Sequence, residues 1–255
     1  YGDSWSLKCL AKYNWNASVY QDPLMPNCVN DASDWQREAY ASAAVLYALS
    51  EQWAFDYSAD YSYNNLNSAA SRTIDSRPYR HTILQSATAK YRNNRLTALA
   101  RLLYSLYLND AKDGASAQNM RRLSPSISLS YKLLEDDDLF IRASYKNIFR
   151  APTFNESYYF HYGSTDLLPE STDQINLGAT WNVSSSSVNL KCTLDGYCNH
   201  VKDMIVAVPY NMFIWTCINV GKVEVLGADI TMDGNCCVSE SHRLLFSGSY
   251  SYQQA

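Results

Sequence analysis

Hydrophobic and polar residues alternate along most of the chain. From Trp53 to Tyr63 the odd positions carry Trp, Phe, Tyr and Ala, while the even positions carry mainly Asp and Ser. A helix would place Asp56 and Asp60 on the same stripe as Tyr57, whereas a strand separates the two kinds of residue onto opposite faces. The pattern therefore predicts β-strands with one apolar and one polar face. Similar alternation recurs at 5–16, 82–91, 123–133, 139–146, 174–181 and 244–252.

We predict eleven strands and connections that alternate in length. Residues 36–50 are rich in Ala and could form a helix, but Trp53 opens a partner strand directly after a tight turn, so we predict a strand here too. The strands are expected at 5–20, 36–48, 53–66, 79–91, 96–108, 121–133, 139–149, 173–182, 188–200, 219–233 and 242–254. Short connections fall near 49–52, 92–95, 134–138, 183–187 and 234–241, and long ones near 21–35, 67–78, 109–120, 150–172 and 201–218.

The length and sidedness of these strands indicate the fold class. Strands of soluble sandwiches average about 5–6 residues, and their inner face is apolar. About 11 residues, tilted by about 45°, cover the roughly 25 Å apolar band of an outer-membrane barrel, whose interior is polar. We therefore predict an all-β fold, an antiparallel transmembrane β-barrel. Because bacterial single-chain barrels have even strand numbers, an odd count favours part of a larger barrel.

Composition narrows the possible functions. The 21 Lys and Arg against 25 Asp and Glu give a net charge of −4, which argues against a nucleic-acid partner. The 21 Tyr and 6 Trp suit an interface between lipid and water. Seven cysteines lack the spacing of a zinc site. The chain opens at Tyr1 without a secretion signal, so we expect a mature piece or a fragment.

The longest loop carries the most distinctive sequence. Residues 149–170 read FRAPTFNESYYFHYGSTDLLPE. This segment resembles the FRAP…NPDLKPE region of TonB-dependent outer-membrane receptors, in the version found in gut Bacteroidota. Residues 201–206 and 219–227 resemble the next hairpin of the same family.

The resemblance implies a barrel of about 22 strands, of which residues 1–255 form half, with the plug domain and the remaining strands absent. It also implies a bacterial outer-membrane transporter that imports a large, scarce nutrient, such as a ferric siderophore, haem or cobalamin. The expected partners are TonB, through the missing N-terminal region, the metal-chelate ligand, outer-membrane lipid, lipopolysaccharide and a surface lipoprotein. No cofactor is expected.

The loop can also be interpreted from its residues. Pro152 fixes the chain direction where the strand leaves the membrane. Arg150 can pair with Glu156, with Asp166 or with lipopolysaccharide phosphates. The residues expected to form a structural loop motif are Phe149, Arg150, Pro152, Asn155, Glu156, Asp166, Pro169 and Glu170.

An aromatic cluster in this loop is the candidate ligand surface. Haem receptors of the family have a His in this interval, where His161 stands, but residues 164–167 lack the Asn and Pro of NPDL. We therefore expect no metal ligand here, and we expect His161 to lie at the surface or to pack in the loop. The candidate ligand-binding residues are Tyr158, Tyr159, Phe160, His161, Tyr162, Met212 and Trp215.

Other functions stay open at this point. The loop could be a rim strut that touches no ligand, and residues 204–215 could be a folded extracellular hairpin. A passive porin or adhesin barrel without a plug is the main alternative to a transporter. An enzyme is not expected, because the sequence has no recognisable nucleophile motif or phosphate loop.

Overall fold

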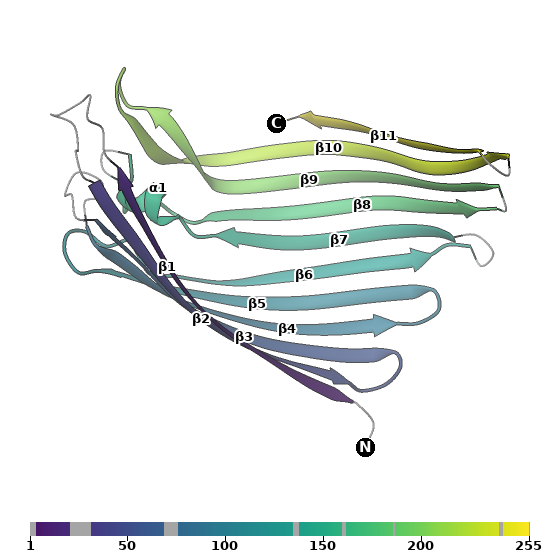
Figure 1. Ribbon diagram of the computed structural model, residues 1–255, viewed down its shortest axis with the longest axis horizontal. Coiled ribbons are helices and arrows are strands. Elements are labelled where there is room, and N and C mark those ends of the chain that lie inside the picture. Colours follow the sequence, from purple (N-terminus) through teal and green to yellow (C-terminus); the bar gives the residue numbers. More distant parts are fainter. Residues whose placement is uncertain are drawn as a thin grey trace.

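The computed structural model describes residues 4–20, 32–68, 76–134, 138–159, 162–185, 187–239 and 242–254. Within these residues the chain forms one antiparallel sheet of eleven strands, each paired with its neighbours in chain order (Figure 1). The strands are β1 (Trp5–Tyr20), β2 (Ala32–Ala48), β3 (Trp53–Ser68), β4 (Pro78–Arg92), β5 (Leu96–Ala111), β6 (Met120–Lys132), β7 (Asp138–Arg150), β8 (Glu170–Ser184), β9 (Val188–Pro209), β10 (Trp215–Ser239) and β11 (His242–Gln254).

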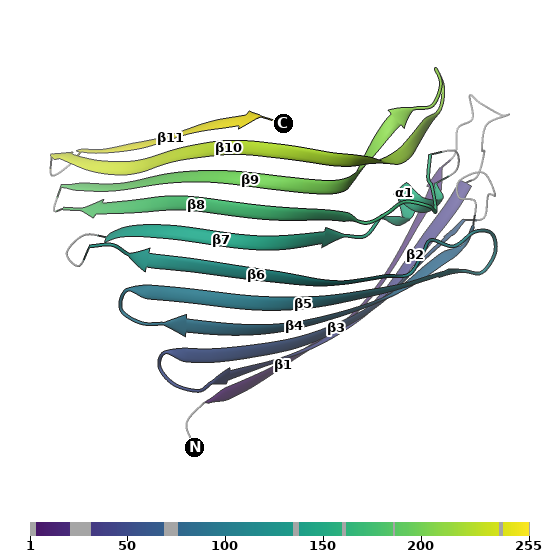
Figure 2. The ribbon, with the colours of Figure 1, turned by 180° about the vertical axis from the view of Figure 1, so that it is seen from behind.

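The two ends of the sheet differ. Figure 2 shows hairpin turns at one end, while the other end carries the short helix α1 (Phe154–Tyr158) and the protruding tip of the β9–β10 hairpin. Short turns mark the periplasmic end of an outer-membrane barrel and long loops its outer end. We call these the turn end and the loop end. No helix in the described ranges is long and apolar enough to cross a membrane.

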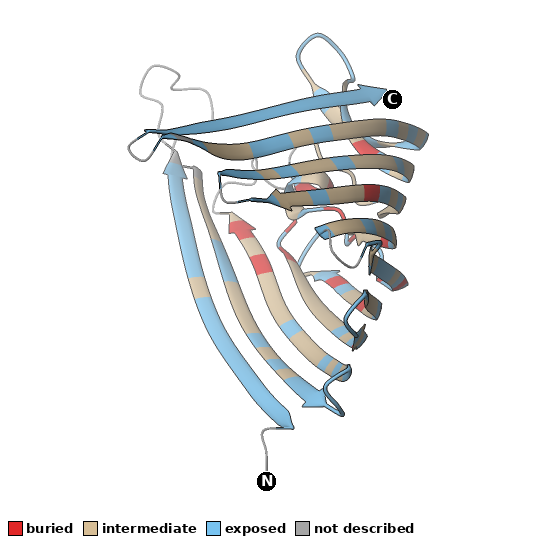
Figure 3. Cartoon of the chain, turned by 90° about the vertical axis from the view of Figure 1, so that its right-hand side faces the viewer, coloured by how far each residue is buried: buried red, intermediate tan, exposed pale blue. Residues whose placement is uncertain are grey.

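The sheet is strongly curved (Figure 3). Ser128 of β6, Arg142 of β7, Asn176 of β8 and Gln253 of β11 line a single hollow, which requires their shared face to be concave. On the other face the apolar side chains stay exposed: Phe55 by 39%, Tyr57 by 50%, Leu129 by 39% and Ile141 by 41%. The predicted sidedness, with a polar inside and an apolar outside, is confirmed.

The buried residues gather near the loop end. Tyr158 is 1% exposed, and Leu167, Ile205 and Cys217 form a small apolar cluster against which Tyr162 packs. Figure 3 shows that β1 and β11, in contrast, are exposed along almost their whole length. The six cysteines in the described part of the chain are all unbridged.

The eleven predicted strands are confirmed, and one long connection is corrected. Residues 201–218 were expected to be a loop, yet β9 runs to Pro209 and β10 starts at Trp215. Alternation is lost there because both faces are apolar: Ile205 packs inwards on the loop cluster, while Met204 lies on the outer face. The true connection is a tight turn in which Asn211 Oδ1 accepts hydrogen bonds from two backbone N–H groups, those of Phe213 and Ile214.

Two other expected connections contain regular structure. The expected loop 150–172 contains α1 and the first residues of β8. The expected short connection at 234–241 is mostly strand, since β10 continues to Ser239. Most of the expected connections at 21–35 and 67–78, and part of the turn at 134–138, lie outside the described residues.

Pro125 separates two neighbouring strands at the loop end. The β6–β7 ladder stops at the pair Ser126–Lys146, although β6 begins six residues earlier, at Met120. Proline has no backbone N–H to donate to a neighbouring strand. The pairing of β6 with β5 continues past Pro125, whereas that with β7 does not. Beyond this point Ser124 Oγ bonds Asn147 Oδ1 at 3.2 Å, so side chains replace the backbone pairing. The separation leaves room for the loop that follows β7.

Candidate functional site

The rim loop, residues 151–169 between β7 and β8, begins with a capped helix. Thr153 is the N-cap of α1, and its Oγ1 accepts a hydrogen bond from Glu156 N at 3.2 Å. Glu156 Oε2 accepts one in return from Thr153 N at 2.8 Å. This reciprocal capping box satisfies two backbone donors that would otherwise lack partners. A helix of five residues is therefore held in place at the start of the loop.

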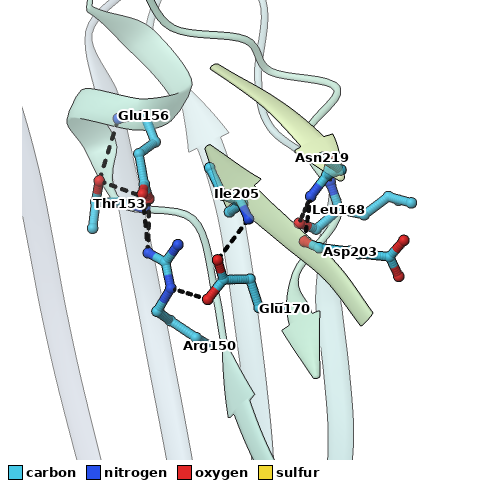
Figure 4. A network of polar contacts seen from close by, with 8 residues as sticks. All are labelled: Arg150, Thr153, Glu156, Leu168, Glu170, Asp203, Ile205 and Asn219. Atoms are coloured by element: carbon cyan, nitrogen blue, oxygen red, sulfur yellow. Dashed lines mark hydrogen bonds and ion pairs between the residues drawn. The ribbon is translucent and has the colours of Figure 1, made fainter. Parts of the chain in front are cut away.

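Arg150 joins the loop to both of its flanking strands (Figure 4). Its Nη1 donates to Glu156 Oε2 at 2.9 Å, and its Nε donates to Glu170 Oε2 at 2.6 Å. Glu170 Oε1 accepts a further hydrogen bond from Ile205 N of β9 at 2.6 Å. Of the partners that the sequence allowed for Arg150, the structure provides Glu156 and adds Glu170. The Asp166 side chain is exposed, and its backbone N–H donates to Ser164 Oγ at 3.3 Å.

This charge cluster lies beyond the apolar band. On the outer face Tyr145 lies opposite Ile175, and the pairs that follow, Asn147 opposite Asp173 and Phe149 opposite Ser171, each contain a polar residue. Arg150 and its ladder partner Glu170 follow, at the very ends of β7 and β8. The cluster therefore stands at the outer rim, outside the apolar band, where its charged groups can exchange protons with water.

The charges of the cluster stabilise one another. The hydrogen bond to Glu170 is the largest cause of the raised pKa of Arg150. The same bond lowers the pKa of Glu170 below its ordinary value. Burial alone would raise the pKa of Glu156, but the hydrogen bonds from Arg150 and Thr153 together outweigh burial and lower that pKa. All three groups are therefore charged near neutral pH.

Asn219 fastens the second half of the loop to the β9–β10 hairpin. Its Nδ2 donates to the carbonyl oxygens of Leu168, at 2.9 Å, and Asp203, at 2.7 Å, while its Oδ1 accepts from Leu168 N at 2.8 Å (Figure 4). Asp203 has a φ of 55°, which is rare for a residue other than glycine. Cys217 N also donates to Tyr162 O at 2.9 Å.

The first half of the loop is fastened on the opposite side. Tyr158 Oη accepts a hydrogen bond from Ala117 N, between β5 and β6, at 2.8 Å. The guanidinium of Arg80 lies 5.2 Å from the ring centroid of Phe154 and 5.7 Å from that of Tyr107. Since cations are attracted to aromatic faces, Arg80 ties β4 to α1. The rim loop is thus braced between β4–β6 on one side and β9–β10 on the other.

The predicted ligand residues fall into different environments. Tyr158 is buried beside Ala117, Tyr162 is partly buried, and Tyr159 is 47% exposed. Phe160 and His161 lie outside the described residues. At the hairpin tip, Met212 is 89% exposed and Trp215 is 54% exposed.

The residues predicted to form the structural motif make separate contacts. Phe149 packs near Tyr107, with ring centroids 5.9 Å apart, and Pro152 is fully buried. Asn155 O accepts a hydrogen bond from Tyr159 N, and Pro169 is half-buried beside Glu170.

Several bracing residues were missed by the sequence analysis. The Thr153–Glu156 spacing is a capping-box signal that could have revealed α1. Arg80, Ala117 and Asn219 gave no local signal, since each acts across a long sequence separation.

The site holds no arrangement suited to metal binding in the part of the chain that the structure describes, where no group of three His, Cys, Asp or Glu converges. Its charged groups pair with one another, so none is left over to bind a ligand. This arrangement suits a rigid frame that holds the neighbouring loop and hairpin surfaces in place.

Comparison with known proteins agrees with this architecture. The family described as TonB dependent receptor-like, beta-barrel matches residues 1–255. No curated protein sequence matches the chain.

Solved structures resemble the fold at low identity. The copper transporter OprC aligns with a TM-score of 0.78 and 14% identity, over 97% of this chain and 43% of that chain. The FrpB iron transporter from Neisseria meningitidis (F5-1 variant) aligns with a TM-score of 0.72 and 13% identity, over 97% of this chain and 41% of that chain. FpvA of P. aeruginosa, bound to a pyoverdine–iron complex, aligns with a TM-score of 0.65 and 12% identity, over 100% of this chain and 39% of that chain.

This chain thus spans less than half the length of each of these proteins. The family match over all of its residues, together with the sidedness of the sheet, assigns the chain. It belongs to the TonB-dependent receptor-like β-barrel family, whose members lie in the outer membrane.

Proposed function

We propose that this chain forms part of the barrel of a TonB-dependent receptor that imports a large metal chelate, such as a ferric siderophore, haem or cobalamin. The observation that carries the proposal is the braced rim loop, which holds an exposed aromatic hairpin tip at the outer end of a polar-lined sheet. A rigid frame with an exposed apolar surface suits capture of a bulky ligand, because the surface needs little ordering on binding.

The tip supplies the recognition chemistry. Tyr210 is 76% exposed, Met212 89%, Phe213 88% and Trp215 54%. Aromatic rings and a thioether stack well on flat or apolar ligand surfaces. Tyr159, on the rim loop, adds a further exposed ring. We propose that Phe160, His161 and Tyr162 continue this surface and that Tyr158 anchors it from below.

The polar inner face suits a plugged channel. Arg142 Nη2 and Asp195 Oδ1 form an ion pair of 2.7 Å on this face, and Asp60 Oδ1 accepts from Tyr40 Oη at 2.8 Å. A wide barrel leaks unless it is plugged. We propose that the plug, the remaining strands and the segment that contacts TonB lie outside residues 1–255, and that a surface lipoprotein is a further partner at the loop end.

The structural neighbours support a metal-containing cargo. The three named above are a copper transporter, an iron transporter and a receptor bound to a pyoverdine–iron complex. These cargoes favour active import of a metal chelate over the alternative of a passive porin or adhesin.

Uptake by cells that carry the intact receptor tests the proposal. Ferric siderophores, haem and cobalamin are supplied as labelled ligands, with and without TonB. The double variant Met212→Ser/Phe213→Ser should weaken ligand binding by about tenfold or more, since buried aromatic contacts dominate binding energy. Gln52→Ser, at an exposed turn of the opposite end, is the control and should leave binding unchanged. Uptake that does not depend on TonB would contradict the proposal.

Conductance separates the transporter from the passive pore. The intact receptor in a planar bilayer should pass almost no current, because a plug fills its lumen. A steady open current would favour the porin.

A further inference from the structure

The strands β6 and β7 are paired along only part of their length. Their ladder ends at Ser126 opposite Lys146. Beyond that point β6 goes on pairing with β5, and β7 with β8, each to its own end at the loop side. Residues 120–125 and 147–150 therefore border a gap within the sheet, which we call the seam.

Side chains close the seam where backbone pairing is lost. Ser124 Oγ donates to Asn147 Oδ1 at 3.2 Å, and Asn147 Nδ2 donates to Asp173 Oδ1 at 2.7 Å. Ser124 is 4% exposed and Asn147 is 7% exposed. Arg122 of β6 reaches past β7, and its Nη2 donates to Ser171 Oγ of β8 at 3.2 Å. Because backbone groups without partners cannot face lipid, the closed seam depends on these polar side chains.

The rim loop belongs to the β7 side of the seam. Arg150 holds Glu156 and Glu170 at 2.9 and 2.6 Å, and charge-assisted bonds of this kind are roughly twice as strong as neutral ones. Asn219 of β10 makes two hydrogen bonds with Leu168 at the other end of the loop. Continuous ladders join β7 to β8, β9 and β10. The rim loop, these four strands and the hairpin tip form one unit, which we call the loop body.

The contacts between the loop body and β4–β6 are weaker. Tyr158 Oη accepts one neutral hydrogen bond from Ala117 N at 2.8 Å. The rings of Phe149 and Tyr107 lie 5.9 Å apart, and α1 rests on a guanidinium of β4. No ion pair crosses the seam among the described residues. The weakest division of the loop end therefore coincides with the seam.

We propose that the seam is a built-in opening of the barrel wall. Beyond Ser126 the loop body parts from β4–β6 and widens the outer mouth, while the paired remainder of the β6–β7 ladder acts as the hinge. Pro125 permits this motion, because its missing N–H stops the ladder from extending further. The loop body moves as one piece, so the hairpin tip keeps its shape. The opening does not depend on the nature of the cargo.

Distances between spin labels test the opening. Labels at the exposed positions Lys112 and Asp166 stand on opposite sides of the seam, in the intact receptor with its native cysteines replaced and in bilayers. Double electron–electron resonance should show two distances, of which the longer belongs to the open seam. Asn147→Ala should raise the ratio of long to short distances about tenfold, because both of its hydrogen bonds are lost. Asn176→Ala, which loses a bond to Ser144 within the fully paired β7–β8 ladder, is the control and should leave the ratio unchanged.

A second variant and a second label pair complete the test. Pro125→Val restores the backbone donor, so the ladder should extend and the longer distance should disappear. Labels at Asp166 and Lys222, both in the loop body, should give one distance in every variant. A single, unchanged distance between Lys112 and Asp166 in the original protein and in Asn147→Ala would overturn the opening. Persistence of the longer distance in Pro125→Val would overturn the role of the proline, and two distances within the loop body would overturn its motion as one piece.

Discussion

Arg150 and Glu170 face each other across the β7–β8 ladder, and a charge-assisted hydrogen bond of 2.6 Å joins their side chains. The same guanidinium holds Glu156 of α1, and the same carboxylate holds Ile205 N of β9. Two residues at the ends of adjacent strands thus fix a helix and a hairpin that are distant in sequence. The rim loop is therefore braced by these contacts, and variants that remove them should loosen it.

Arg150→Lys should loosen the rim loop without unfolding the sheet. Lysine keeps the charge but lacks the planar fork that reaches two carboxylates. The arginine side chain is 39% exposed, so solvent screening limits the expected local loss to about 1–2 kcal/mol. Hydrogen exchange of residues 151–169 measures it. Arg77→Lys, at the more exposed pair with Asp113, is the control, and equal protection in both variants would contradict the bracing role.

Acidification should release the same loop. The pKa values of Glu156 and Glu170 lie below the ordinary value of 4.5, so their stabilisation is complete above that pH. It is lost as the pH falls through the lowered pKa values, because each carboxylate then binds a proton and loses its charge. The loss is followed by the amide hydrogen-exchange rates of residues 151–169, measured between pH 7 and about 3. Each rate is corrected for the intrinsic exchange rate at its pH. In Glu156→Gln/Glu170→Gln the pH dependence should disappear, and its persistence would point to other groups.

Tyr158→Phe should weaken the contact between the rim loop and the β5–β6 connection. The variant keeps the buried ring but leaves Ala117 N without its acceptor, at a cost of about 1–3 kcal/mol. The amide exchange of Ala117 should accelerate accordingly. Tyr159→Phe serves as the comparison, since Tyr159 is half exposed, and should leave Ala117 unchanged. An unaltered Ala117 rate in Tyr158→Phe would contradict the contact.

Gly178→Ala should disturb the inner wall. A Cβ at this position would lie 2.0 Å from Asp195 Oδ1 and 2.9 Å from Leu194 O, so the Asp195 carboxylate, which pairs with Arg142, must shift. Overpacking of this kind costs about 1–3 kcal/mol. The urea midpoint of the folded barrel should fall. Gly196→Ala, where the nearest atom is 3.8 Å away, adds the same group with room to spare and should change little.

The sheet was predictable because its two faces differ in polarity along the whole membrane-spanning part of the strands. Where Phe55 and Tyr57 alternate with Asp56 and Ser58, one face meets lipid and the other meets polar groups, and the period of two survives. Beyond the rim this contrast ends. Ile205 packs on the loop while Met204 lies outside, so the hairpin lost its sequence signature although its backbone pairing continues.

The site was predictable only in its local parts. The Arg150–Glu156 contact spans six residues and follows from neighbouring charges, and Thr153 completes a capping pattern. The contacts of Asn219 with Leu168 and of Tyr158 with Ala117 cross 51 and 41 residues. Such pairs depend on the strand order and on the separation of β6 from β7 at Pro125. Local pattern cannot encode them.

The most direct measurement is the accessibility of adjacent residues to lipid-soluble and water-soluble collision probes. Single spin labels are placed at Leu129 and Ile141, and at their neighbours Ser128 and Arg142, in a receptor whose native cysteines are replaced and which is reconstituted in bilayers. Labels at Leu129 and Ile141 should collide mainly with oxygen, the lipid-soluble probe. Labels at Ser128 and Arg142 should collide mainly with the water-soluble probe or be shielded inside the protein. If the labels at Leu129 and Ile141 were shielded from lipid while their neighbours met bulk water on the outside, the barrel assignment would be wrong.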